Sequence, residues 1–403
     1  MAEKTNVPEI RFAGFTDPWE QRKLGEFGSV AMCKRIYKEQ TSEQGDVPFF
    51  KIGTFGADPD AFISNELFED FKRTYPYPTP GTLLISAAGS IGRVVEYQGE
   101  KAYFQDSNIV WLEHDHRLND AFLKPLYSQI EWGLEGSTIK RLYNKDLLSA
   151  EVTIPDGGEQ KEIGQFFARL DSLITLHQRK YDKLAQLKKS MLDKMFPKPG
   201  ERFPEIRFAG FTDPWEQRKL GEFSKKRTTK NADGALSETF TNSAEQGVIS
   251  QLDYFDHDIT NDANISGYYV VQPDDFVYNP RISATAPCGP INRNRLDRAG
   301  VMSPLYTVFS VDASVNKTYL EHYFKTSRWH DFMFLEGNSG ARSDRFSISD
   351  ATFFEMPIWC PEISEQKAIA KQLEAIDHLI TLHQRKLELL RNTKKSLLDR
   401  MFV

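Results

Sequence analysis

The sequence has few cysteines, no long apolar run and no excess of positive charge. Its 403 residues include three cysteines, Cys33, Cys288 and Cys360. So small, odd and scattered a set argues against a disulfide framework and fits a reducing cytoplasm. No stretch approaches the roughly 20 apolar residues that a membrane span requires. The first residues, Met1 to Asn6, lack the basic and apolar regions of a signal peptide, and we expect a cytoplasmic protein that does not enter a membrane.

The charge balance is acidic. The formal net charge is −6 and the sequence pI is near 5.9, whereas domains that bind nucleic acid by themselves are usually basic. Any contact with DNA must therefore rest on local groups of basic residues or on a partner protein.

Sequence motifs of catalysis are also scarce. Glycine-rich motifs that bind dinucleotides or phosphates are absent. The string Tyr278-Asn279-Pro280-Arg281 lacks the second proline and the aromatic residue of an amino-methyltransferase motif. Pro59-Asp60 and Asp70-Phe71-Lys72 fit a nuclease pattern only superficially, and His114-Asp115-His116 is too isolated to predict a metal site. We expect no catalytic residue and no metal ligand in this chain.

What the sequence does contain is a tandem repeat. The segment Pro8–Phe27, PEIRFAGFTDPWEQRKLGEF, recurs letter for letter at Pro204–Phe223. We call these two segments the anchors. A second pair, Glu159–Phe196 and Glu365–Phe402, shares its opening, the string LITLHQRK and its ending. The order is anchor, module, helix, anchor, module, helix, and the C-terminus could be joined back to residue 1. Such a chain suits a pseudo-two-fold molecule that offers equivalent surfaces to two copies of one partner.

The second repeated pair predicts two long amphipathic helices. Apolar residues recur at alternating spacings of three and four, which is the heptad pattern of a coiled coil. A helix of about 35 residues is roughly 50 Å long. We expect the two helices to pack antiparallel and to act as a spacer; ordinary bundle helices without a spacer role are the alternative. The seam residues are Ile163, Phe167, Leu170, Ile174 and His177 in the first helix, and Ile369, Leu373, Ile376, Ile380 and His383 in the second.

Between the repeated parts lie two modules with almost no sequence similarity to each other. Short apolar runs punctuated by glycine and proline predict strands at 82–86, 92–97 and 107–112 in the first module, and at 268–271, 275–278 and 305–309 in the second. Helices are expected at 121–131 and 318–334. Each module is therefore predicted to mix α and β structure.

Basic residues gather in the predicted loops of both modules. Arginine and lysine reach the phosphates and base edges of DNA, although a solvated charged surface is the alternative. The candidates for DNA binding are Arg93, Lys140, Arg141, Arg281, Arg293, Arg295, Arg342 and Arg345.

Together these features carry a resemblance to a known family. They include FAGFTDPWEQRKLGE at 12–26 and 208–222, the helix openings Glu159-Gln160-Lys161 and Glu365-Gln366-Lys367, and module strings such as Phe276-Val277-Tyr278. Over its whole length the chain resembles the specificity subunit of a type I restriction–modification enzyme. The resemblance implies an α+β fold. Two target-recognition domains, at 1–155 and 201–358, would be separated by two long antiparallel coiled-coil helices, at 156–200 and 359–403, in a pseudo-two-fold internal repeat.

The resemblance also implies a function. Each domain would read one half of a bipartite, asymmetric DNA site. The helices would set the gap and dock two methyltransferase (modification) subunits, which restriction (motor and nuclease) subunits would join. The chain itself would be non-catalytic and bind no cofactor. S-adenosylmethionine, ATP and Mg²⁺ would be bound by partner subunits of the adenine-specific methyltransferase and ATP-dependent endonuclease. Two alternatives are a protein-binding scaffold with two interaction modules and a fused single-chain methyltransferase or nuclease.

Overall fold

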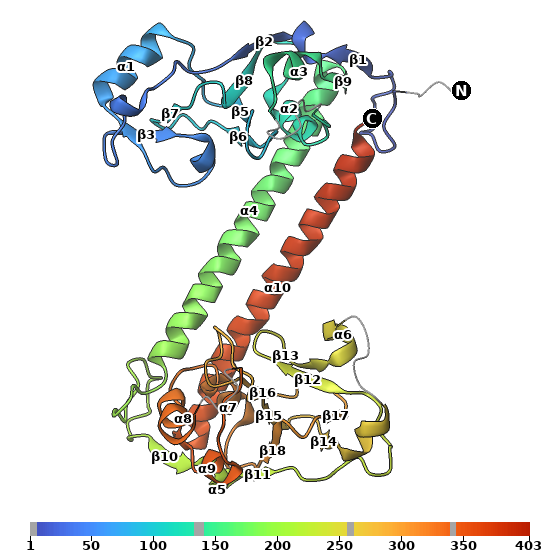
Figure 1. Ribbon diagram of the computed structural model, residues 1–403. Coiled ribbons are helices and arrows are strands. Elements are labelled where there is room, and N and C mark those ends of the chain that lie inside the picture. The colour runs from blue at the N-terminus through green and yellow to red at the C-terminus, as the bar shows by residue number, and fades with distance from the viewer. Residues whose placement is uncertain (1–5, 133–140, 256–261, 339–343) are drawn as a thin grey trace. The chain divides into compact units, whose positions relative to one another are not determined.

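The protein divides into two compact units that share its two long helices. The computed structural model describes residues 6–132, 141–255, 262–338 and 344–403. Unit 1 comprises residues 1–178 and 385–403, and unit 2 comprises residues 179–384. Helix α4 (Gly157–Lys194) therefore begins in unit 1 and ends in unit 2, whereas α10 (Ile363–Met401) does the reverse (Figure 1).

Unit 1 is built around an antiparallel four-stranded sheet. Its strand order is β2 (Gly28–Ala31), β8 (Ile109–His114), β5 (Leu83–Ser86) and β6 (Val94–Glu96). A smaller sheet has the order β4 (Phe62–Ile63), β3 (Val47–Phe50) and β7 (Tyr103–Phe104). Along β5, Leu83 and Ile85 enter one core and Leu84 enters another. Both faces of the sheet are therefore covered, which is why its strands appear as continuous apolar runs. Helices α1 (Asn65–Thr74), α2 (Asp120–Tyr127) and α3 (Asn144–Ser149) complete the module.

Unit 2 repeats the four-stranded sheet with different residues, but its smaller sheets differ from that of unit 1. Its four-stranded sheet has the order β11 (Ser224–Lys226), β18 (Thr307–Val311), β15 (Phe276–Tyr278) and β16 (Ile291–Arg293). Along β15, Phe276 and Tyr278 enter one core and Val277 enters the other. Two further strand pairs are β12 (Phe240–Ser243) with β13 (Gly247–Ser250) and β14 (Tyr269–Val271) with β17 (Gly300–Met302). The helices are α5 (Leu220–Phe223), α6 (Gln251–Phe255), α7 (Lys317–Tyr323), α8 (His330–Glu336) and α9 (Asp350–Phe354).

The expected strands are confirmed to within a few residues, but the expected helix at 318–334 is wrong. The chain forms two helices there, α7 and α8. Helix α7 ends at its C-cap residue, Phe324. The buried indole of Trp329 donates a hydrogen bond of 3.2 Å to the carbonyl of Phe324. The helix expected at 121–131 also ends early, at Tyr127, because the carbonyl of Pro125 accepts a tight-turn bond from the amide of Ser128.

Each anchor joins the two ends of its own module. The identical EQRK strings form β1 (Glu20–Lys23) and β10 (Glu216–Lys219). They pair antiparallel with β9 (Glu151–Ile154) and β19 (Pro357–Cys360), the strands that lead into α4 and α10. An anchor strand therefore closes its module just before the long helix begins.

A buried ion pair locks each anchor to the first turns of a long helix. Arg11 donates two hydrogen bonds of 2.7 Å to the carboxylate of Glu159, which is fully buried. Arg207 makes the same two bonds of 2.7 Å to Glu365. The repeated residues thus have identical tasks inside the chain, and part of their identity follows from this internal packing.

The glutamines beside these carboxylates hold a helix of each module. The side-chain oxygen of Gln160 accepts a bond from the amide of Asn119, the N-cap of α2. Gln366 accepts the same bond from Asn316, the N-cap of α7. The two modules are therefore docked on their helices in the same way despite their different sequences.

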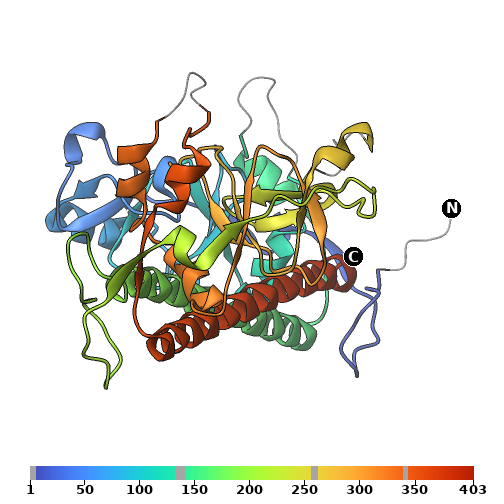
Figure 2. The same cartoon turned by 90° about the horizontal axis from the view of Figure 1, so that it is seen from below.

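The anchors also bind the last residues of the long helices. In unit 2 the amide of Ile206 donates to the carbonyl of Lys194 at 2.9 Å, and in unit 1 the amide of Ile10 donates to the carbonyl of Arg400 at 3.0 Å. Figure 2 shows the segment after the N-terminus beside the end of α10. The first contact joins neighbouring parts of the chain, whereas the second joins its two ends.

The two long helices pack antiparallel. Within unit 1, Asp171 of α4 bonds to Lys394 of α10 at 2.5 Å, and Gln178 bonds to Arg391 at 3.0 Å. As the residue numbers rise along α4, the numbers of the residues that they contact fall along α10, so the two helices run in opposite directions. In unit 2 the equivalent ion pair is reversed: α4 supplies the lysine, Lys188, and α10 supplies the aspartate, Asp377, at 2.5 Å. No helix in the described ranges has the length and apolar character to cross a membrane.

The seam residues differ in burial along each helix. Ile163, Phe167, Ile369, Leu373 and Ile376 are buried in the cores of their own units. The remaining seam residues, Leu170, Ile174, His177, Ile380 and His383, are half-buried. The first turns of each heptad pattern therefore reflect packing against a module as well as packing against the other helix.

Candidate nucleic-acid interface

In each unit, one loop of the central sheet lies beside a segment that is distant in sequence. The loops are 87–93, between β5 and β6, and 279–290, between β15 and β16. In unit 1 the amide of Leu142 donates to the carbonyl of Ala87 at 2.9 Å, and in unit 2 the amide of Phe346 donates to that of Pro280 at 2.8 Å. In unit 2 this contact brings the basic candidates Arg281 and Arg345 together, whereas in unit 1 it lies beside Arg141 alone.

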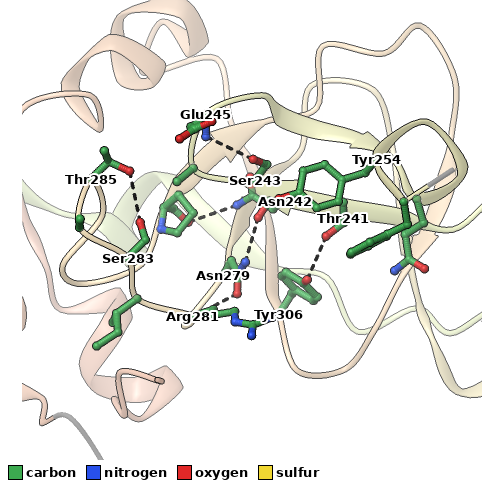
Figure 3. Close-up of a pocket in the computed structure, with 16 residues that line it drawn as sticks. Thr241, Asn242, Ser243, Glu245, Tyr254, Asn279, Arg281, Ser283, Thr285 and Tyr306 are labelled. Carbon is green, nitrogen blue, oxygen red and sulfur yellow. Dashed lines mark hydrogen bonds between the residues drawn. The ribbon is translucent and has the colours of Figure 1, made fainter. Parts of the chain in front are cut away.

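In unit 2 the loop 279–290 borders a polar cleft of about 550 Å³. Its lining includes the hydroxyl groups of Thr241, Ser283 and Tyr306 and the side chain of Arg281 (Figure 3). The amide of Arg281 donates to the side-chain oxygen of Asn279 at 3.0 Å. Residues of this kind donate to and accept from base edges, so the cleft is suited to a polar ligand.

The two candidate arginines of unit 1, Arg93 and Arg141, each donate a hydrogen bond to a backbone carbonyl. The guanidinium of Arg93 is exposed and donates to the carbonyl of Gly56 at 3.1 Å. That of Arg141 donates to the carbonyl of Ser107 at 3.0 Å and lies 6.0 Å from the ring centre of Tyr143. Neither bond neutralises the charge, so both groups keep donors for another acceptor.

Two other candidates are paired with carboxylates. Arg293 is buried between Asp274 and Glu321, at 3.4 Å from each, and burial lowers the pKa of its guanidinium. Arg295 pairs with Glu321 at 2.8 Å and with Glu374 of α10 at 3.1 Å. These arginines link their sheet to helices of unit 2, so a role in DNA binding would require them to leave these partners. Lys140 and Arg342 lie outside the described residues.

A second basic surface escaped the sequence-based predictions. In unit 1 the ammonium of Lys34 lies 4.9 Å from the ring centre of Tyr75, and that of Lys72 lies 5.1 Å from the ring centre of Tyr77. Both lysines are exposed, and an ammonium group is attracted to the face of an aromatic ring. The signal was present as the run Lys34-Arg35-Ile36-Tyr37-Lys38, which follows β2.

The strings that suggested catalysis each have a local partner. Asp60 pairs with Lys51 at 2.8 Å and Asp70 with Arg73 at 3.0 Å, in separate exposed ion pairs. His114 bonds to Asp120 at 2.9 Å, and this bond raises the pKa of the histidine. Across the described ranges, no group of His, Cys, Asp and Glu has the geometry to hold a metal ion.

The long helices carry one more repeated feature, an exposed pair of leucines. In α4, Leu173 and Leu176 are 43% and 46% exposed, and in α10 the matching Leu379 and Leu382 are 42% and 53% exposed. Each pair lies in the string LITLHQRK, and residues three apart face the same side of a helix. We call these the leucine patches. The same apolar surface is present once in each unit.

Known proteins share both the sequence and the fold. The family model of the type I restriction modification DNA specificity domain matches residues 16–186. A protein of Haemophilus influenzae, described as a type I restriction enzyme specificity subunit, is 50% identical over 153 residues, which cover 38% of this chain and 40% of that protein. Another of that description, from Methanocaldococcus jannaschii, is 23% identical over 98% of this chain and 94% of its own length.

One solved structure shares the fold along the whole chain. The S subunit of the type I restriction–modification system from M. genitalium has a TM-score of 0.58, with 14% identity, 98% of this chain covered and 99% of that chain covered. At this identity the likeness concerns the fold alone.

Proposed function

We propose that this chain, which belongs to the specificity subunits of type I restriction–modification enzymes, reads one half of a split DNA site with each module. The observation that carries the proposal is that the two modules share their central sheet and their docking on the helices, whereas their loops differ in sequence. The four-stranded sheets of both modules have the same strand order, and both modules dock on their helices in the same way. Their loops present different residues, as two readers of different base sequences would. Because the net charge of the chain is acidic, the positive charge that attracts DNA phosphates would come from these loops and from the partner subunits.

The repeated leucine patches support the docking of two copies of one partner. Exposed leucines on a helix are a common form of protein interface, because burying them removes apolar area from water. Because Leu173 and Leu176 recur as Leu379 and Leu382, a partner that binds one patch can bind the other. We assign this partner as the methyltransferase subunit, with restriction subunits joining that core. S-adenosylmethionine, ATP and Mg²⁺ would belong to those subunits, and the whole assembly would act on DNA in the cytoplasm.

The helices supply a means to set the gap between half-sites. Helix α4 has 38 residues and α10 has 39, so each is about 57 Å long at about 1.5 Å per residue. One heptad adds about 10.5 Å, close to three base pairs at about 3.4 Å each. Adding one heptad to both helices should widen the recognised gap by about three base pairs. An unchanged gap would contradict the spacer role, and insertion into α4 alone should disrupt assembly because the antiparallel register is lost.

The decisive experiment maps methylated adenines in genomic DNA with the full chain and its methyltransferase subunits present. We expect one bipartite motif. Replacing residues 28–155 with another module should change one half of the motif and leave the other half as a built-in control. A methylase-competent complex without any sequence preference would instead favour the scaffold alternative.

The docking surface has its own test. Replacing Leu173 and Leu176 with serine should reduce the bound methyltransferase from two copies to one, measured by light scattering or native mass spectrometry. Adding the same changes at Leu379 and Leu382 should abolish binding. The control is Leu335→Ser on α8, since this leucine is 80% exposed and lies outside both patches. Retention of two copies by the fourfold variant would refute the assignment.

A further inference from the structure

Arg281 and Arg345 are held side by side in unit 2 by a short antiparallel bridge. The amide of Ile282 donates to the carbonyl of Asp344 at 3.0 Å, and the amide of Phe346 donates to that of Pro280 at 2.8 Å. The two arginines thus form the pair between the hydrogen bonds, where Cα atoms are about 4.5 Å apart and side chains leave the same face. Two positive side chains are therefore directed to one side of the bridge.

This pair has no carboxylate partner in the described part of the chain. Other arginines of unit 2 differ in this respect: Arg227 pairs with Asp275 at 3.0 Å and Arg298 with Glu238 at 2.7 Å. Glu245 also lines the cleft beside Arg281, but the described residues include no ion pair between it and either arginine. Like charges directly opposed across two strands destabilise the fold. The arrangement therefore leaves two arginines available to a ligand rich in acceptors.

The backbone under Arg281 is well supported. Asn279 accepts from the amide of Arg281 through its side-chain oxygen and donates to the carbonyl of Asn242 at 2.8 Å. Gly289 closes the loop at a φ of +81°, and a Cβ there would lie 2.0 Å from the carbonyl oxygen of Asn279. Because the backbone that carries Arg281 is held in place in this way, less entropy is lost when its guanidinium binds a ligand.

The first module lacks this pair. The bond from Leu142 to Ala87 matches the bond from Phe346 to Pro280, so Ala88 stands where Arg281 stands and Arg141 where Arg345 stands. A phosphate contact is independent of sequence and would serve both modules equally. A residue that is present in one module only, at the edge of a polar cleft, is better suited to reading a base.

We propose that Arg281 and Arg345 read guanine in the half-site recognised by the second module, and this inference rests on the proposed function. An arginine reaches the O6 and N7 atoms of guanine with two parallel hydrogen bonds in the major groove. The arginine pair belongs to one half of the bipartite site, and the other half is read without it.

The test uses the full chain in complex with its methyltransferase subunits. Arg281→Ala, Arg345→Ala and the double variant are compared with Arg298→Ala, which removes an arginine of the same unit that is paired with Glu238. Methylated adenines are mapped in genomic DNA, and binding is measured with duplexes that differ at single positions. We expect discrimination at a guanine of one half-site to fall by about 5- to 150-fold. The other half-site and the Arg298→Ala pattern should stay unchanged.

Different outcomes separate the possible failures. A uniform loss of affinity for all sequences, with a salt slope smaller by about one per arginine, would show phosphate contacts and overturn the inference, as would an unchanged motif. A wild-type complex that methylates without any bipartite motif would overturn the proposed function itself. Arg281→Lys guards against a folding artefact: it keeps the charge but not the two-pronged donor, so it should relax the guanine position while the salt slope stays constant.

Discussion

Removing Arg11 should destabilise unit 1 far more than removing an exposed arginine of the same anchor. The carboxylate of Glu159 is fully buried and accepts two bonds of 2.7 Å from Arg11 and one of 3.0 Å from the indole of Trp19. Arg11→Met leaves that carboxylate without its countercharge. Loss of one partner from a buried pair costs about 3–5 kcal/mol, so we expect the free energy of unfolding of unit 1 to fall by that amount.

The matched control is Arg22→Ala. Arg22 pairs with Glu20 at 2.8 Å, but the two side chains are 48% and 69% exposed, and exposed pairs contribute about 0–1 kcal/mol. The double variant Arg11→Met/Glu159→Met should recover most of the loss, because it removes the buried charge together with its partner.

Urea unfolding gives the size of the effect, and hydrogen exchange read by mass spectrometry gives its place. Protection should fall in β1, β9 and the first turns of α4. Peptides around Arg207 and Glu365, which form the equivalent pair in unit 2, should remain protected. If Arg11→Met and Arg22→Ala cost the same, the ion pair does not lock the anchor and our reasoning is refuted.

Three further predictions concern other parts of the chain. Burial lowers the pKa of His322 to about 3, below its ordinary value of about 6.5. The unfolded state therefore takes up the proton first as the pH falls, and stability declines below about pH 6.5. By pH 5 the free energy of unfolding should have fallen by about 2 kcal/mol, whereas His322→Leu should lack this fall. If urea unfolding shows the same dependence on pH for both proteins, the prediction is wrong. Phe196 is buried and packs with Trp215 and Tyr319 at ring distances of 6.1 and 5.5 Å, so Phe196→Ala should cost about 3–5 kcal/mol in the same assay, and a loss under 1 kcal/mol would disagree with this packing. A Cβ on Gly28 would lie 1.9 Å from the carbonyl oxygen of Glu113. Gly28→Ala should therefore separate β2 from β8 and lower the melting temperature. Gly157→Ala, whose Cβ would meet nothing within 4 Å apart from its own chain neighbours and helix backbone, should be neutral or slightly stabilising.

The repeated parts of the chain were predictable because their signals are local. Helical periodicity is a property of neighbouring turns, so the seam from Ile163 onward predicted α4 without any knowledge of its surroundings. The strands 82–86 and 275–278 were equally clear, because both faces of the central sheets are covered and the strands are apolar throughout. The match between the anchors predicted equivalent roles, although not the buried contacts with Glu159 and Glu365.

The sequence by itself determined that this protein is a duplicated frame around two different modules, because repeats and periodicity are properties of the linear order of residues. Only the tertiary structure decided which arginines have carboxylate partners. Arg293 and Arg281 look alike in sequence, yet Glu321 and Asp274 neutralise the first, while the second stands beside Arg345. The physical reason is that the electrostatic environment of a side chain depends on residues that folding brings close, and those residues are distant along the chain.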